Sequence, residues 1–254
     1  MKVTYQALTD VGRKRKGNED SLFVNAEQKL FVVADGMGGH AAGEIASSIA
    51  VDSINEFVCL TSGDEQITCP FGLDETISYD GNRLKTAVRF ANKKVLEATR
   101  EKSEYEGMAT TVCAVLVDDK VANLAHVGDS RVYLVREGGL SQLTSDHSWV
   151  NEQIQSGVIS PEQARSHPLR NVVTRALGGK ADLQVDMQTH EIQTGDVLLL
   201  CSDGLTTMIP DDEIARVMRE GEGDIEETAQ ALVDAANAKG GEDNITVLLL
   251  KFEE

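Results

Sequence analysis

The sequence of residues 30–36 is LFVVADG, a run of apolar residues that ends in an Asp-Gly pair. A short run rich in valine and bounded by turn residues is typical of a buried β-strand. The same pattern recurs at residues 198–204, which read LLLCSDG. Both runs predict a strand that leads directly into a carboxylate, and this combination guides the interpretation of the rest of the chain.

Further apolar runs predict the other strands of a packed sheet. Tight turns at Asp118-Asp119 and at Glu137-Gly138-Gly139 join neighbouring runs, which predicts antiparallel hairpins. The expected strands are Phe23-Val24 and residues 30–34, 110–117, 121–127, 132–136, 197–201 and 245–252.

Helical periodicity is equally visible. Apolar residues recur at intervals of three or four between residues 82 and 99, and again between 224 and 239, where Gly240-Gly241 supplies a stop. A third helix is expected at 43–57. The sequence SPEQ at 160–163 has the form of a capping box with proline in the first turn, which predicts the start of a short helix.

The composition is that of a folded, strongly acidic protein. The chain has 254 residues, and 24 Lys and Arg against 42 Asp and Glu give a net charge of −18. Its 41 % of hydrophobic residues excludes a disordered acidic chain. Because strands and helices alternate without a linker or repeat, residues 1–254 are expected to form one α+β domain with an irregular loop at about 59–81. The negative charge disfavours nucleic acid and anionic membranes as partners.

The sequence also bears on the compartment. No segment has the apolar length that a membrane span or a signal peptide needs. The cysteines, Cys59, Cys69, Cys113 and Cys201, form no CxxC pair, and two of them lie in apolar runs where a free thiol acts as a small hydrophobic group. We therefore expect a soluble monomer in the reducing cytoplasm.

Four aspartates fall at the ends of predicted strands. Asp35 and Asp203 directly follow strands, Asp129 follows the run AHVG, and Asp243 precedes NITVLLL. Taken singly, each is more simply explained as a turn or a strand cap. Together they indicate a cluster on one rim of the sheets, and clustered carboxylates repel one another unless cations compensate. Oxygen ligands without Cys or His favour Mg²⁺, Mn²⁺ or Ca²⁺ over structural zinc.

Two neighbouring segments add to this cluster. Residues 10–21, DVGRKRKGNEDS, hold four consecutive cations beside Glu19 and Asp20. A solvated basic turn explains them as well as a site in which an arginine fork binds phosphate and the two acids reach metal ions. In the glycine-rich stretch 35–43, the carbonyl of Gly36 can itself be a ligand. That stretch lacks the spacing of a nucleotide-binding loop.

Five motifs in order resemble those of the metal-dependent protein phosphatases of type 2C, most closely the compact bacterial members. They are RKGNED at 15–20, DGMGGH at 35–40, GDSR at 128–131, CSDGL at 201–205 and EDNIT at 242–246. The resemblance spans nearly the whole chain. It implies a four-layer αββα sandwich, two antiparallel β-sheets flanked by helix pairs, with a metal site in a cleft at one end.

The resemblance implies roles for individual residues. Asp35 is similar to a carboxylate that bridges two Mn²⁺ or Mg²⁺ ions. The other implied ligands are Asp203 and Asp243 at the first ion, Glu19 and the Gly36 carbonyl at the second, and Asp129 with Asp203 at a weaker third. Asp20 is expected behind the ligands, and Arg15 is expected to bind phosphoryl oxygens.

The implied activity is hydrolysis of phosphoserine and phosphothreonine in proteins by a metal-activated water, opposing a Ser/Thr kinase. Many eukaryotic members carry a histidine where this chain has Met37. His40 and a metal-bound water are both candidates for the general acid, and His40 is equally compatible with a structural role. Residues 144–171 resemble the bacterial flap beside the active site, in which Trp149 is expected to be an anchor rather than a substrate contact.

Two other classes of function remain to be weighed. One is a non-catalytic phosphoprotein-binding or sensor module of the same fold, against which the complete set of acids argues. The other is a different metal-dependent phosphoesterase such as a nuclease, which the charge of −18 disfavours.

Overall fold

The computed structural model describes residues 1–38, 42–63, 72–221 and 223–254. Within these ranges the strands form two antiparallel sheets, of order β1-β11-β10-β7-β8 and β2-β3-β5-β6-β9. The first sheet contains β1 (Lys2–Asp10), β7 (Arg131–Arg136), β8 (Gly139–Gln142), β10 (Val197–Cys201) and β11 (Ile245–Glu253). The second contains β2 (Asp20–Asn25), β3 (Leu30–Met37), β5 (Val112–Asp118), β6 (Val121–Val127) and β9 (Asp186–Glu191), with β4 (Ala109–Thr110) pairing to β3.

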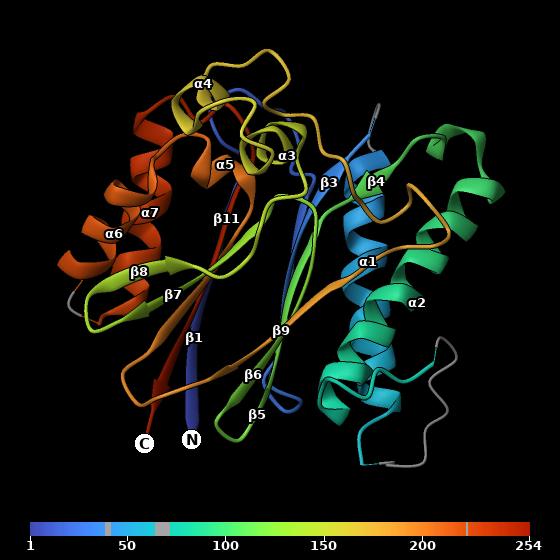
Figure 1. The fold of residues 1–254 in the computed structure, drawn as a ribbon, viewed down its shortest axis with the longest axis horizontal. Helices are drawn as coiled ribbons and strands as arrows, with labels where there is room; N and C mark the ends of the chain where they lie inside the picture. Colours follow the sequence, from blue (N-terminus) through green and yellow to red (C-terminus); the bar gives the residue numbers. More distant parts are fainter. Residues whose placement is uncertain (39–41, 64–71, 222) are drawn as a thin grey trace.

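Helices cover the outer face of each sheet (Figure 1). The second sheet is covered by α1 (Ala42–Leu60) and α2 (Tyr79–Glu101), and the first by α6 (Asp211–Glu220) and α7 (Ile225–Ala238). The shorter helices are α3 (Trp149–Gln155), α4 (Pro161–Arg165), α5 (Asp203–Thr206) and the 3₁₀ turn Ser103–Tyr105. The predicted α+β class, an αββα sandwich of two antiparallel sheets, is confirmed.

Strand β3 shows why its sequence is apolar without alternation. Phe31 and Val33 pack between the two sheets, whereas Val32 and Ala34 pack under α1 and α2. Successive side chains of a strand point to opposite faces, so a strand that is covered on both sides must be apolar at every position. The apolar run therefore stops at Asp35, which lies within β3, and the strand itself continues to Met37.

Most of the predicted strands and helices are present, but several observed elements were not predicted. The predicted strands and the three long helices are present, and the antiparallel hairpins β5–β6 and β7–β8 and the Ser160 capping box are confirmed. The sequence interpretation missed β1, β9, α3, α5, α6 and the 3₁₀ turn, and the single strand expected at 110–117 is divided into β4 and β5. Strands β1 and β9 lie at sheet edges and carry many polar, partly exposed residues, so they lack a continuous apolar run.

The predicted irregular loop at 59–81 is shorter at both ends. Helix α1 continues to Leu60 and α2 begins at Tyr79, where Ser78 caps it by accepting a hydrogen bond from the Gly81 amide. Residues 64–71 of this loop lie outside the described residues.

The two ends of the sandwich differ. Figure 1 shows both chain termini at one end and α3, α4 and α5 gathered at the other. At this second end, Asp35 lies near the end of β3, and β10 leads through Ser202 into Asp203, the first residue of α5. In the ranges that the structure describes, we find no helix with the length and apolarity of a membrane span.

Candidate active site

A pocket of about 290 Å³ opens at the end of the sandwich where β3 and β10 terminate. We call it the acid pocket. It is lined by Arg15, Glu19, Asp35, Gly36, Met37, Gly38, Asp129, Asn171, Val173, Asp203 and Asp243. The structure thus brings together residues of all five sequence motifs. His40, the candidate general acid, lies outside the described residues.

The basic N-terminal segment is fastened to the start of β11 by Asn244. The Asn244 side chain accepts a hydrogen bond from the Glu19 amide (2.8 Å) and donates to the carbonyls of Val11 and Gly17 (2.9 Å each). Next to it, Arg15 Nη2 donates to Asp243 Oδ2 at 2.7 Å. Asn244 therefore holds the segment that carries Arg15 and Glu19 against the pocket, a role that its position within a motif did not reveal.

Two glycines permit the close approach of α1 to the end of β3. A Cβ on Gly36 would lie 2.1 Å from the Gly43 carbonyl oxygen, and a Cβ on Gly43 would lie 2.8 Å from Cδ of Glu19. The Gly36 amide also donates to the Glu19 carbonyl (3.0 Å). Any larger residue at either position would push β3, α1 and Glu19 apart, so these glycines set the position of Glu19.

Asp20 is buried behind the acid pocket and links the two sheets. It pairs with Asp35 in the β2–β3 register and accepts hydrogen bonds from Ser202 Oγ (2.7 Å) and Thr246 Oγ1 (2.6 Å). Burial raises the pKa of Asp20 to about 7. Asp20 is not among the residues that line the pocket, and its hydrogen bonds to Ser202 and Thr246 hold it behind them.

The carboxylates of the pocket are surrounded by protein and by one another. Burial, together with neighbouring carboxylates, raises the pKa of Asp35 and of Asp203. For Asp129, burial and then the charges of Asp203 and Asp146 raise the pKa to about 8. Five acids face one arginine among the residues that line the pocket, so most of their mutual repulsion is uncompensated.

This donor set fits divalent cations in its chemistry. It offers carboxylate oxygens and the Gly36 carbonyl, which are the ligands that Mg²⁺ and Mn²⁺ prefer. Within residues 1–38, 42–63, 72–221 and 223–254, no three His, Cys, Asp or Glu side chains close into a ready ligand shell. Arg15 pairs with one oxygen of Asp243. Binding of a cation at Asp243 therefore competes with this ion pair.

The turn that carries Asp129 is held by a histidine that the sequence interpretation did not select. Gly128, at a φ of 111°, donates its amide to His147 Nδ1 (3.0 Å), and the His147 amide donates to the Gly128 carbonyl (2.7 Å). On its other side, His147 Nε2 lies 3.1 Å from Asp186 Oδ2, and its ring packs at 4.6 Å on that of His126. In the sequence, the only indication of a role for His147 was its position in the segment 144–171, which resembles the bacterial flap.

The same segment reaches the edge of the acid pocket. The Trp149 ring stacks on His167 at 4.8 Å, so Trp149 packs within the segment, as expected. Asn171 and Val173, which the sequence interpretation missed, line the pocket. The segment that connects β8 to β9 is thereby joined to the pocket at Asn171 and to the Asp129 turn at His147.

Comparison with known proteins identifies the family. A family model described as protein phosphatase 2C matches residues 13–245. The chain belongs to this family. It is therefore a phosphatase, as its motifs predicted, and it is 39% identical over 250 residues to the serine/threonine phosphatase stp of Listeria monocytogenes, covering 96% of this chain and 93% of that relative.

Solved structures agree over the full length. The Mycobacterium tuberculosis serine/threonine phosphatase PstP/Ppp is 36% identical to this phosphatase, with a TM-score of 0.87 and 99% of each chain covered. A structure of the catalytic domain of the serine/threonine protein phosphatase PstP, in complex with two manganese ions, is 34% identical with a TM-score of 0.84, again covering 99% of each chain.

Proposed function

We propose that this phosphatase hydrolyses phosphoserine and phosphothreonine in proteins with the help of two divalent ions, Mn²⁺ or Mg²⁺, and so opposes a Ser/Thr kinase. The observation that carries the proposal is the gathering of five carboxylates and Arg15 in one pocket, at the end of a sandwich of the protein phosphatase 2C family. The names of the relatives and the two manganese ions of the PstP domain support it.

The proposed ligands follow from the positions of the acids. Asp35 would bridge both ions, with Asp203 and Asp243 at the first and Glu19 and the Gly36 carbonyl at the second. Asp129, with Asp203, would hold a weaker third ion. When bound, the ions supply an activated water for in-line attack on phosphorus and neutralise the acids.

Arg15 has two partners in this proposal. Its guanidinium pairs with Asp243, yet its side chain is 49% exposed. Solvent therefore screens this ion pair, and breaking it costs little free energy. Once Asp243 serves as a ligand, Arg15 exchanges it for the phosphoryl oxygens. The planar fork then binds two of these oxygens and stabilises the charge that develops on them in the transition state.

The remaining parts of the proposal concern the frame around the pocket. Residues 1–254 act as one catalytic domain, Asp20 orients the pocket from behind, and residues 144–171 serve as a flap beside it. The protein works as a monomer in the cytoplasm, where the buried free thiols of Cys113 and Cys201 stay reduced.

Hydrolysis of three substrates, followed as phosphate release for the first two and as strand cleavage for the third, tests this function. The chelated protein, with and without added Mn²⁺, is given a phosphoserine peptide, an aryl phosphate and a single-stranded oligonucleotide. We expect Mn²⁺ to restore hydrolysis of the first two and to leave the oligonucleotide intact. Full activity without metal would contradict the mechanism. Tight binding of the phosphopeptide without turnover would indicate a binding module, and cleavage of the oligonucleotide a nuclease.

A further inference from the structure

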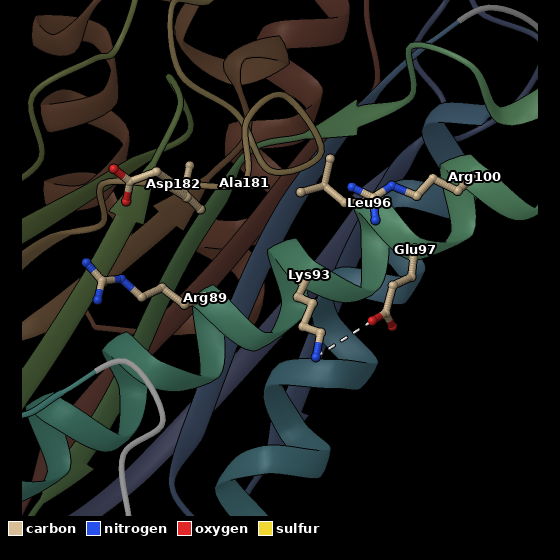
Figure 2. Close-up of a pocket in the computed structure, with 8 residues that line it drawn as sticks. Arg89, Lys93, Leu96, Glu97, Arg100, Ala181 and Asp182 are labelled. Atoms are coloured by element: carbon tan, nitrogen blue, oxygen red, sulfur yellow. Dashed lines mark ion pairs between the residues drawn. The ribbon is translucent and has the colours of Figure 1, made fainter.

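A second charged hollow lies away from the acid pocket, between α2 and residues 181–183. Its volume is about 470 Å³, and we call it the α2 groove. The residues that line it are Arg89, Lys93, Leu96, Glu97 and Arg100 of α2, and Ala181, Asp182 and Leu183 opposite. Figure 2 shows the α2 side chains along the helix, with Ala181 and Asp182 across from them.

The helix that forms this groove is cationic in an acidic protein. Helix α2 carries six Lys and Arg against three Asp and Glu, whereas the whole chain has a net charge of −18. Two of the six are held within the fold, since Arg83 contacts Asp80 and Lys85 donates to Asp74 at 2.8 Å. The groove takes three of the others, Arg89, Lys93 and Arg100, and their spacing of four and seven residues sets them on one face of the helix. Glu97 and Asp182 also line the groove, so its lining carries a formal charge of +1.

Two cations of the groove, Lys93 and Arg100, are accessible to an incoming acid. Lys93 Nζ lies 3.8 Å from Glu97, and the two side chains are 65% and 45% exposed, so this ion pair is loose and can be exchanged. Arg100 is exposed. Between the charged ends, half-buried Leu96 and buried Leu183 give the groove an apolar floor. Cations above an apolar floor fit a peptide that carries both acidic and apolar side chains.

One stretch of chain connects the groove to the acid pocket. Val173 lines the acid pocket, Arg175 and Lys180 line a hollow of about 360 Å³ beside it, and Ala181 begins the wall of the α2 groove. Val173 and Ala181 are eight positions apart in the chain, so their Cα atoms are at most roughly 30 Å apart. An extended peptide of about the same number of residues spans this distance.

We propose that the α2 groove docks an acidic stretch of the phosphoprotein substrate that lies within about eight residues of the phosphorylated residue. The inference rests on the proposed phosphatase function and defines its substrates as phosphoproteins with a run of Asp and Glu near the phosphorylated site. Most of the enzyme surface repels such a run. A local cationic groove therefore both attracts the substrate and fixes its direction relative to the acid pocket.

Matched phosphopeptides test the proposal in the manganese-loaded enzyme. All share one phosphoserine core and an uncharged spacer of about eight residues. They end in a run of Asp and Glu or of Asn and Gln, placed on either side of the core. We expect the acidic run, on one side, to raise kcat/KM on the order of fivefold at low salt, mainly through KM, and less at high salt.

Charge reversal on α2 assigns this gain to the groove. Lys93→Glu and Arg100→Glu should each remove most of the gain while leaving hydrolysis of the core peptide unchanged. Lys94→Glu is the matched control, because Lys94 is the adjacent cation and its Nζ packs over the Phe90 ring at 5.3 Å instead of lining the groove. Thermal unfolding of each variant verifies that the fold is retained.

The outcomes separate the two proposals. If the core peptide itself is not hydrolysed, the proposed function fails. If the core peptide is hydrolysed but neither acidic run helps, the docking proposal fails alone. Equal losses in Lys93→Glu and Lys94→Glu would overturn it in favour of a diffuse charge effect. A change of oligomeric state in Lys93→Glu, with no effect of the acidic run, would overturn it in favour of a second copy as the occupant.

Discussion

The acid pocket and the α2 groove are two charged hollows of opposite sign on one stretch of chain. In the acid pocket, carboxylates such as Asp35 and Asp203 are enclosed, and burial raises their pKa values. In the groove, Lys93 is exposed and held by a loose ion pair. A buried carboxylate has lost its hydration and needs a bound cation to remain charged. An exposed charge stays hydrated, so an ion pair stabilises it only slightly. Changes in the pocket should therefore abolish activity on every substrate, and changes in the groove should only grade it.

Replacement of Asp35 is the strongest test of the acid pocket. Because Asp35 is proposed to hold both core ions, Asp35→Ala should lose nearly all turnover on phosphopeptides and aryl phosphates alike. Initial rates across a Mn²⁺ titration, with calorimetric counting of bound ions, measure this. Asp212→Ala, at an exposed acid of α6, is the control. Near-normal rates for Asp35→Ala at saturating Mn²⁺ would contradict its assignment.

Arg15 should give the next largest effect, because it is the cation that faces the five acids. Arg15→Ala should lower kcat/KM on the order of 10², and Arg15→Lys should recover part of it, since lysine lacks the planar fork. Steady-state kinetics on a phosphoserine peptide measure both. Lys14→Ala and Lys16→Ala are the neighbouring controls. If they cost as much as Arg15→Ala, the segment acts as a diffuse basic patch.

The difference between the two hollows also explains what could be predicted from the sequence. Asp35 and Asp203 lie where buried apolar runs end, so these runs mark the rim, and both acids were identified together with the α+β class. The motifs added Arg15 and Glu19. These features are local in sequence, and the family resemblance assigned their roles.

Features that depend on contacts between distant segments were not predicted. His147 holds the Gly128 turn across the β7–β8 hairpin by one backbone and one side-chain hydrogen bond, and nothing in the sequence around His147 specifies that partner. Likewise, the α2 groove forms only because residues 181–183 pass beside α2. Helix α2 was predicted correctly, but its charge alone resembles that of any solvated helix face.

Replacement of Asp129 should lower activity less than replacement of Asp35 or Arg15, and more than a charge reversal in the α2 groove. Asp129 is proposed to hold a weaker ion, so Asp129→Ala should keep the fold and the two core ions and should slow phosphopeptides more than an aryl phosphate. A leaving serine or threonine oxygen needs a proton, whereas a nitrophenolate departs with little help. The values of kcat for both substrates across a Mn²⁺ titration test this. Equal slowing of both, or an unchanged ion count, would refute the role of Asp129.

His126 gives the smallest effect and concerns a buried group that stays neutral. It is 3% exposed, neither ring nitrogen makes a well-formed hydrogen bond within the described residues, and burial, reinforced by His147 and Arg175, lowers its pKa to about 3. The unfolded chain binds a proton at this residue near pH 6.5 and the folded chain only near pH 3. Folded stability therefore falls as the pH drops through this window.

Replacement of His126 by phenylalanine keeps the ring but removes this proton. Between pH 7.5 and pH 5.5, the free energy of unfolding of the manganese-loaded wild type should fall by about 1 kcal/mol more than that of His126→Phe. Urea titrations at both pH values measure the difference, which cancels the pH dependence of every other group. His167→Phe, at a partly exposed ring that stacks on Trp149, is the control. Parallel pH profiles for wild type and His126→Phe would contradict this prediction. They would mean that His126 takes up its proton at the same pH in the folded and the unfolded protein, so that burial does not lower its pKa.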